Sequence, residues 1–179
     1  DQEEIKNSVK KICDQFSPQY WRDLDKAGEF PEDFVKAITD GGWLGIAMPE
    51  EYGGAGLGIM EAAVLAHTIS NSGAGFSGAS AIHLNLFGPH PIVVFGTEEQ
   101  KKRFLPPLIK GEERACFAVT EPDSGLNTLA LNTEAVRDGD NYVVNGKKLW
   151  TTTAQTANKI LLITRTMAAD SGSPLILSL

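Results

Sequence analysis

The sequence predicts an α+β fold, in which an N-terminal all-α helical bundle is followed by the opening strands of an antiparallel, β-barrel-like domain. Apolar residues recur at intervals of three and four as far as Gly111, which is the period of an amphipathic helix. Beyond Gly111 they recur at intervals of two, which is the period of a strand. The change of period divides the chain into a helical domain, residues 1–112, and a partial β domain, residues 113–179.

The helical part begins with a single apolar stripe. Ile5, Val9 and the apolar residues after them are spaced by three or four, which predicts a helix over residues 2–16. Two short helices should follow, over residues 18–28 and 31–41. Each starts at a proline, which suits the first helical turn because its missing N–H costs nothing there, and each ends near a glycine.

Glycines are frequent in residues 42–58, which we interpret as a loop between helices. Part of this loop resembles a dinucleotide-binding loop, but Ile59 stands where the third glycine of that pattern would fall. Residues 59–70 are apolar on nearly all sides and predict a helix inside the bundle, with His67 as a hydrogen-bonded core residue.

Two further helical segments lead to the β part. Residues 77–95 should form a helix that the segment 88–91, which contains two prolines, kinks or breaks. Thr97 and Gln100 have the spacing of a capping box and predict the start of the next helix. That helix should bury Phe104, Leu105, Leu108 and Ile109.

Alternating apolar residues predict strands at 115–119 and 142–144. A stretch rich in Ile and Leu predicts a strand at 159–164, and a short apolar run predicts one more at 175–177. Turn residues lie at 138–140 and at Asn145-Gly146. Asn-Gly is the strongest two-residue signal for a β-hairpin, so we expect a hairpin there.

The composition is that of an ordinary globular chain of 179 residues, 42% hydrophobic and 22% charged. A net charge of -7 argues against a nucleic-acid partner, because such binding depends on clustered Lys and Arg. No apolar run approaches the roughly 20 residues of a membrane span, and the N-terminus does not resemble a signal peptide. We therefore expect the protein in a bacterial cytoplasm or, after import, in the mitochondrial matrix.

Familiar catalytic signatures are missing from the sequence. The patterns of serine hydrolases, P-loop NTPases and zinc proteases do not occur. Cys13 and Cys116 lack metal-ligand spacing and provide no disulfide framework, so we expect both to be small buried residues. The three histidines have no cysteines or paired carboxylates near them, and we predict no metal site.

Two predicted strand ends carry an unusual set of side chains. One strand ends in Thr120-Glu121-Pro122-Asp123-Ser124-Gly125, and another ends in Trp150-Thr151-Thr152-Thr153. Hydroxyls, free backbone N–H groups and one large aromatic ring suit a planar heteroaromatic ligand with hydrogen-bonding edges, such as a flavin. The alternative is a polar turn beside an edge strand in which threonine is favoured by its β propensity alone.

Four segments resemble the acyl-CoA dehydrogenase family and follow the order in which the family has them. They are WLGIAMPEEYGGAG at 43–56, FGTEEQK at 95–101 with Leu105-Pro106, Thr120-Glu121-Pro122, and Trp150-x-Thr152. The resemblance covers nearly the whole chain. It implies an FAD-dependent enzyme that converts an acyl-CoA thioester into a 2-enoyl-CoA.

The resemblance also implies which residues hold FAD: Phe117, Val119, Thr120, Gly125, Leu126, Trp150, Thr151 and Thr152. Thr120 would face the pyrimidine edge of the isoalloxazine, where hydrogen-bond donors favour negative charge on the reduced ring. Trp150 would pack against the ring face away from the substrate. Thr152 would hydrogen-bond near N5, the atom that accepts hydride.

The substrate contacts implied by the resemblance are Leu126, Asn127, His83 and Phe87. Most family members have Gly-Ser-Asp where this chain has Gly125-Leu126-Asn127. Because the Leu126 side chain cannot hydrogen-bond, we expect the substrate preference to differ. His83 and Phe87 match a helix that lines the acyl cavity in the family, and ordinary core packing is an equal alternative for both.

In the family the catalytic glutamate base lies in a C-terminal helical domain, so we expect no catalytic residue in these 179 residues and no activity from them alone. The resemblance further implies electron-transfer flavoprotein as the acceptor and a homo-oligomer for the full-length enzyme. Two alternatives stay open. One is an acyl-CoA oxidase or flavin monooxygenase of the same fold, and the other is a non-enzymatic helical interaction module.

Overall fold

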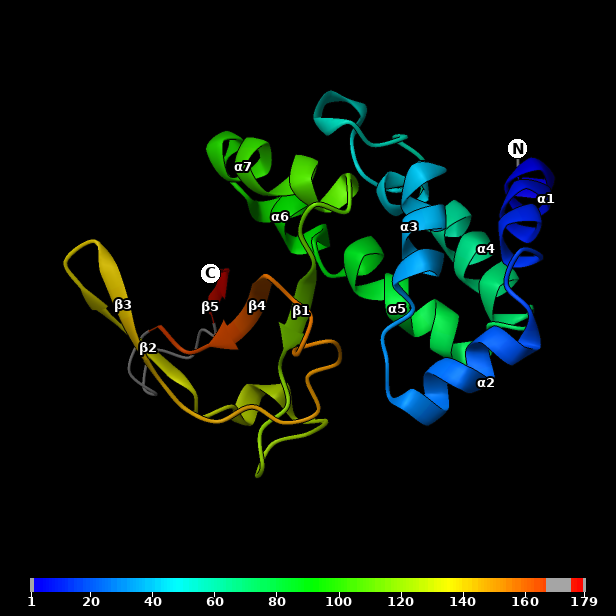
Figure 1. Ribbon diagram of the computed structural model, residues 1–179. Coiled ribbons are helices and arrows are strands. Elements are labelled where there is room, and N and C mark those ends of the chain that lie inside the picture. Colours follow the sequence, from blue (N-terminus) through cyan, green and yellow to red (C-terminus); the bar gives the residue numbers. More distant parts are fainter. Residues whose placement is uncertain (1, 167–174, 179) are drawn as a thin grey trace. The chain divides into compact units, whose positions relative to one another are not determined.

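The computed structural model describes residues 2–166 and 175–178 (Figure 1). The chain divides into two compact units, Asp1–Arg114 and Ala115–Leu179. The first unit contains the α-helices of the described residues and the second contains their strands. The predicted α+β fold class is confirmed.

The α-helices of the first unit are α1 (Gln2–Cys13), α2 (Pro18–Ala27), α3 (Glu32–Asp40), α4 (Ile59–Ser70), α5 (Gly75–Phe87), α6 (His90–Phe95) and α7 (Glu98–Ile109). The Ser17 Oγ accepts a hydrogen bond from the Tyr20 N–H at 3.2 Å and caps α2. The predicted capping box of α7 is confirmed, because Thr97 Oγ1 accepts from the Gln100 N–H at 3.2 Å and Gln100 Oε1 accepts from the Thr97 N–H at 2.8 Å. The predicted break between α5 and α6 is also present, at residues 88–89.

Packing of α1 along α4, and of α4 along α5, forms the helical core (Figure 1). Phe34, Ile38 and Leu65 are completely buried in it. The Trp21 ring meets the edge of Phe34 with their centroids 4.9 Å apart. Side chains spaced by three and four therefore converge on one core, as the periodicity predicts.

Two predictions about side chains of this unit are wrong. His67 is exposed rather than buried, because the covered side of α4 is the one carrying Leu65 and Ile69. Phe104 is half-buried, with the Arg103 guanidinium 5.0 Å from the centre of its ring. Both residues lie beside the buried stripe of their helix and not on it.

The predicted loop 42–58 contains two short 3-10 helices, η1 (Trp43–Gly45) and η2 (Glu50–Tyr52). Its glycines allow close backbone packing. A Cβ on Gly54 would lie 2.1 Å from the carbonyl oxygen of Met48, so no other residue fits there without a shift.

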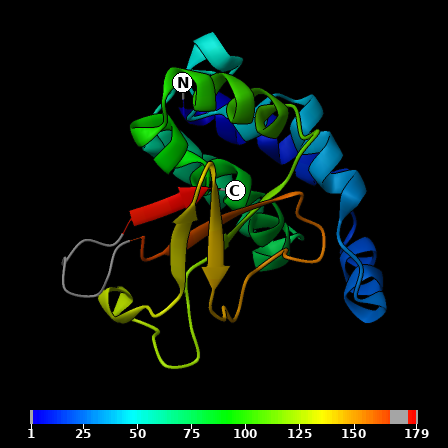
Figure 2. The ribbon, with the colours of Figure 1, turned by 90° about the vertical axis from the view of Figure 1, so that its left-hand side faces the viewer.

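The second unit contains β1 (Ala115–Ala118), η3 (Thr128–Ala130), β2 (Glu134–Asp138), β3 (Asn141–Asn145), β4 (Lys159–Thr164) and β5 (Leu175–Ser178). One sheet has the order β1-β4-β5, and β2 pairs with β3 in a separate antiparallel hairpin (Figure 2). The final predicted strand is present as β5, and residues 167–174 before it fall outside the described part of the chain. Cys13 and Cys116 are both buried, as expected, and burial raises the pKa of each thiol.

Two details of the strands differ from the prediction. First, β1 pairs with β4 in parallel, with Phe117 opposite Leu161, whereas we expected antiparallel strands. A parallel pair requires a long crossover connection, and here the whole segment between Ala118 and Lys159 provides it. The described strands form an open sheet and a hairpin, not a closed barrel.

Second, the tight hairpin turn lies at residues 139–140, where Asp138 faces Asn141, and not at Asn145-Gly146. Gly146 has a packing role instead, since a Cβ there would lie 2.3 Å from Thr133 Oγ1. The predicted Asn-Gly hairpin is therefore wrong.

Backbone hydrogen bonds join the hairpin to the end of β4. The Ala135 N–H donates to the Arg165 carbonyl at 2.7 Å, and the Arg165 N–H donates to the Thr133 carbonyl at 2.8 Å. These bonds place the segment before β2 beside the residue that follows β4.

Candidate functional site

The first predicted site segment continues from β1. Phe117 is the exposed residue of this strand, with 38% of its surface accessible between buried neighbours. Val119 and Thr120 follow it and are half-buried. Because β1 runs parallel to β4, residues 119–120 leave the sheet at the edge where β4 also ends.

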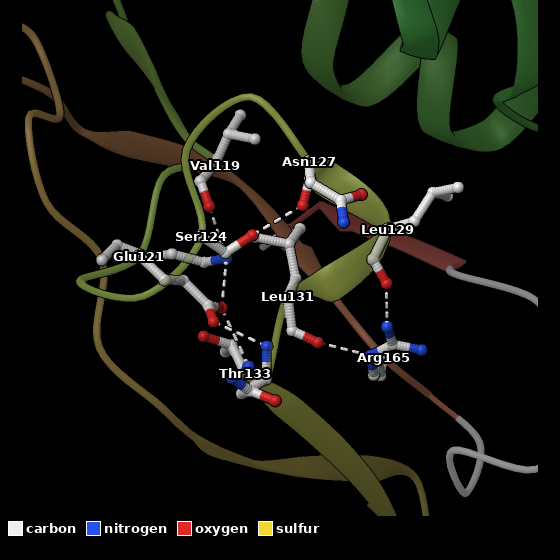
Figure 3. A network of polar contacts seen from close by, with 10 residues as sticks. Val119, Glu121, Ser124, Asn127, Leu129, Leu131, Thr133 and Arg165 are labelled. Atoms are coloured by element: carbon white, nitrogen blue, oxygen red, sulfur yellow. Dashed lines mark hydrogen bonds and ion pairs between the residues drawn. The ribbon is translucent and has the colours of Figure 1, made fainter.

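A closed turn follows at residues 121–124. The Glu121 N–H donates to the Ser124 carbonyl at 2.9 Å, and the Ser124 N–H donates to the Glu121 carbonyl at 3.2 Å. The Ser124 Oγ donates to the Asn127 carbonyl at 2.7 Å (Figure 3). The turn is thus held by its own backbone and by one hydroxyl.

The loop after the turn is held again at its far end. The Arg165 guanidinium donates to the carbonyl oxygens of Leu129 and Leu131 (Figure 3). Between the two anchors the Leu126 side chain is fully exposed and Asn127 is also exposed. Apart from its two chain neighbours, no atom of the described residues lies within 4 Å of the position that a Cβ would occupy on Gly125. The loop therefore presents Gly125 and Leu126 to open space.

The Glu121 carboxylate connects the turn to the segment before β2. It is buried, with 5% of the residue exposed, and accepts hydrogen bonds from the N–H of Asn132 at 2.6 Å and of Thr133 at 2.8 Å (Figure 3). Burial by itself raises the pKa of this carboxyl, but the Lys148 ammonium and the donors of residues 132 and 133 outweigh burial and lower the pKa to about 2. Glu121 is therefore ionised in the folded protein at neutral pH.

The second predicted site segment lies along the first. The Lys148 Nζ donates to Glu121 Oε1 at 2.8 Å and to the Val119 carbonyl at 2.8 Å. The next residue, Leu149, donates its N–H to the Thr120 carbonyl at 2.8 Å. The residues before Trp150 are thereby held against the residues after β1.

Trp150, Thr151 and Thr152 lie in a loop, whereas the sequence predicted the end of a strand. Trp150 is 87% exposed, and its backbone φ is 59°, in the left-handed region. Thr153 has a φ of 63°, which is unusual for a β-branched residue. β3 already ends at Asn145, and the left-handed φ values keep Trp150 and Thr153 themselves out of any strand. Strained backbone of this kind concentrates at functional sites.

The two predicted substrate contacts of the helical unit, His83 and Phe87, lie on α5. His83 is half-buried, with its Nδ1 at 2.8 Å from the Ser80 carbonyl oxygen. Phe87 is 36% exposed at the end of the helix. Both therefore have accessible surface in addition to their packing contacts.

Sequence reasoning missed two residues of the site, Glu121 and Lys148. Glu121 stood out only as part of a strand end and of a segment that resembles the family, and Lys148 did not stand out at all. The signal that could have found them is an acid directly after Thr120 and a base two residues before Trp150, each close to a predicted ligand-binding residue. In a strand-rich unit, two such charges are candidates for one buried pair.

Among the described residues, no group of three or more His, Cys, Asp or Glu side chains could hold a metal ion. In that same part of the chain no helix has the length and apolar character to cross a membrane. The arrangement at residues 117–126 and 148–152 instead combines exposed aromatic rings, hydroxyl groups and open space beside a glycine. Such a combination suits a planar aromatic ligand with polar edges.

Known proteins match this chain over both units. The family model described as acyl-CoA dehydrogenase, N-terminal domain, matches residues 1–112. The model described as acyl-CoA dehydrogenase, middle domain, matches residues 116–177. Together these matches cover almost all of the sequence.

Individual relatives agree with the family models. The 3-(aryl)acrylate reductase of Clostridium sporogenes is 36% identical over 166 residues, which are 88% of this chain and 43% of the relative. The mitochondrial isovaleryl-CoA dehydrogenase of Bos taurus is 32% identical over 168 residues, 93% of this chain and 39% of the relative. The crystal structure of an acyl-CoA dehydrogenase from Geobacillus kaustophilus matches with a TM-score of 0.83 and 27% identity, over 99% of this chain and 47% of that one. The chain thus spans less than half the length of each of these proteins.

Proposed function

The chain belongs to the acyl-CoA dehydrogenase family of oxidoreductases, and from this premise we propose that it contributes the flavin-binding face of an FAD-dependent acyl-CoA dehydrogenase. Under this proposal residues 1–112 are the N-terminal helical domain and residues 113–179 are part of the middle domain. One observation carries the proposal. The hydrogen bond from the Leu149 N–H to the Thr120 carbonyl joins the two segments that the sequence assigns to the flavin.

The residues present fit an isoalloxazine ring. Trp150 offers a large exposed aromatic face, and Phe117 offers a second exposed ring at the end of β1. The open space beside Gly125 allows close approach of a cofactor to the backbone. Thr120 and Thr152 supply hydroxyl groups from the two segments. Val119, Leu126 and Thr151 complete the proposed set.

FAD, when bound, supplies the acceptor for the hydride that leaves the β carbon of an acyl-CoA thioester. The residues of this chain bind and orient the cofactor. Thr120, Thr152 and Trp150 would hold the isoalloxazine ring. Thr120 would hydrogen-bond to its pyrimidine edge, Thr152 would hydrogen-bond near N5, and Trp150 would cover the ring face away from the substrate and exclude water from it. The base that takes the α proton is not among these residues, so we propose that the chain by itself binds FAD without oxidising acyl-CoA.

Substrate and partners are part of the same proposal. Leu126 and Asn127 contact the thioester end of the acyl-CoA, and His83 and Phe87 form part of the wall around the acyl chain. The complete enzyme is a homo-oligomer that passes electrons to electron-transfer flavoprotein, in a bacterial cytoplasm or in the mitochondrial matrix. The isovaleryl-CoA dehydrogenase among the relatives supports an acyl-CoA substrate, since that is the substrate its name states.

Titration of the purified chain with FAD tests the proposal. Saturable binding with a changed flavin absorbance spectrum is expected, together with no acyl-CoA-dependent reduction of an artificial electron acceptor. Failure to bind FAD contradicts the assigned flavin site. Turnover by the chain alone contradicts the assignment of the base to a region outside it. Rapid consumption of oxygen by the complete enzyme would favour an acyl-CoA oxidase or a monooxygenase instead.

The relative named 3-(aryl)acrylate reductase makes reduction of an acrylate a second candidate, since it is 36% identical to this chain. The same flavin site serves both directions, because saturation of a conjugated double bond returns the hydride that dehydrogenation removes. Supplying the complete enzyme with an aryl acrylate and a reduced electron donor separates the two candidates.

A further inference from the structure

The Glu121–Lys148 pair is a pair of buried charges for which the proposed chemistry has no direct use. The side chains are 4% and 9% exposed, and Lys148 Nζ lies 2.8 Å from Glu121 Oε1. Removing two charges from water is costly, so a buried ion pair is weak evidence for stabilisation by itself. In some proteins such pairs instead fix the relative positions of the segments that carry them.

Three segments meet at this pair. Glu121 follows β1, and its carboxylate accepts from the backbone of Asn132 and Thr133 ahead of β2. Lys148 comes after β3, and its ammonium also donates to the Val119 carbonyl at 2.8 Å. Every one of these contacts is made to a part of the chain that is distant in sequence. The pair therefore holds three separate segments of the second unit together, and its effect is not confined to one local turn.

Both charged residues lie within two positions of a proposed flavin contact. Glu121 follows Thr120, and Lys148 precedes Trp150 by two residues. Between them, the Leu149 N–H is bonded to the Thr120 carbonyl at 2.8 Å. Trp150 then adopts a left-handed φ of 59°, a conformation that persists only when surrounding contacts impose it.

We propose that the Glu121–Lys148 pair is the positioning element of the flavin site, which holds Thr120 and Trp150 in one geometry before the cofactor binds. This inference rests on the proposed function. A site formed in advance binds more tightly, because binding no longer has to order its loops. Glu121 and Lys148 act through the neighbouring residues and do not touch the cofactor.

The test compares Lys148→Met with the matched control Lys147→Met, since Lys147 is the exposed neighbour in the same segment. In Lys148→Met we expect the Leu149 amide to exchange at least about tenfold faster without FAD, because its bond to Thr120 loses support. We expect the Kd for FAD to rise about tenfold or more, by analogy with the loss of metal affinity when the outer-shell partners of metal ligands are removed. Lys147→Met should leave both values unchanged, and Lys148→Arg should recover part of the affinity.

The double variant Glu121→Gln with Lys148→Met separates positioning from stability. Removing both charges should recover much of the melting temperature lost in either single variant, since no unpaired charge stays buried. Fast exchange of Leu149 and weak FAD binding should persist. Recovery of FAD affinity together with the melting temperature would overturn the inference, as would wild-type affinity in Lys148→Met.

The two proposals fail in different ways. If the unaltered chain binds no FAD, the proposed function is contradicted, whereas faster Leu149 exchange in Lys148→Met still supports the positioning of these segments. If the chain binds FAD and Leu149 exchange is the same in Lys148→Met and in the control, the positioning role is refuted and the flavin site stands.

Discussion

Replacing Glu121 by glutamine should destabilise the unit formed by residues 115–179. The carboxyl pKa falls from 4.5 to about 2 in the folded protein, because Lys148 and the backbone donors outweigh the effect of burial. At about 1.4 kcal/mol per pKa unit, this difference corresponds to about 3 kcal/mol of folding free energy at neutral pH. Removing one partner of a buried ion pair usually costs about 3–5 kcal/mol, which agrees. Glu121→Gln should therefore lower the free energy of unfolding by about 3 kcal/mol at about pH 7.

The pH dependence follows from the direction of the shift. A carboxyl whose pKa is lowered by folding stabilises the protein at pH values above its unfolded pKa, and this contribution is lost as the pH falls from 4.5 toward 2. The difference between the wild type and Glu121→Gln should accordingly shrink from about 3 kcal/mol at about pH 7 to about 1.4 kcal/mol at about pH 3. Other carboxylates titrate in both proteins and largely cancel in the difference.

Fluorine NMR during urea unfolding can follow this unit by itself, if the protein is labelled with fluorotryptophan. Trp150 lies in the second unit, whereas Trp21 and Trp43 lie in the first, so the Trp150 signal reports the unfolding of interest. Asp123→Asn is the matched control, because Asp123 is exposed in the same turn and its loss should change stability by less than about 0.5 kcal/mol. A Glu121→Gln protein as stable as the wild type at neutral pH, or a difference that does not vary with pH, would refute the reasoning.

Three further predictions concern single side chains. Gly146→Ala should destabilise the second unit by about 1–3 kcal/mol in urea unfolding, since the new Cβ would lie 2.3 Å from Thr133 Oγ1, and unchanged stability would mean that the two segments separate easily. Phe34→Ala should cost the helical unit about 3–5 kcal/mol by the same measurement, because the ring is completely buried, and a loss below about 1 kcal/mol would contradict that burial. Trp150→Ala should weaken FAD binding in a fluorescence titration while leaving stability within about 0.5 kcal/mol, because the side chain is 87% exposed; a large loss of stability would indicate a packing role instead.

The helices were predictable because their signals are local. Ile5 and Val9 lie on one face of α1 whatever the rest of the chain does, and the Thr97–Gln100 capping box satisfies backbone groups within one turn. Their lengths were less predictable, since residues 14–16 belonged to the predicted first helix and α1 ends at Cys13. The position of His67 also failed, because an apolar helix does not reveal from its own residues which side its neighbours will cover.

Four of the described strands were predictable as segments but not as a sheet, and β2 (Glu134–Asp138) was not predicted. Alternation identified β1, and richness in Ile and Leu identified β4, yet neither signal carries information about whether two strands run parallel. The Asn145-Gly146 hairpin signal failed because the backbone at Gly146 packs against Thr133, a contact between different segments that overrides the local turn preference.

By itself, the sequence determined the order of a helical unit and a β unit, the family, and the two segments that we assign to the flavin. These features can be recognised from residues that are close together in the sequence, because their spacing alone shows which side chains share a face of a helix or strand. Only the tertiary structure decided that Lys148 would pair with Glu121, 27 residues away, and that Leu149 would bond to Thr120 ahead of a left-handed Trp150. A buried charge or backbone group cannot bond to water and must find a partner within the protein. The fold decides which partner lies within reach, and spacing in the sequence does not.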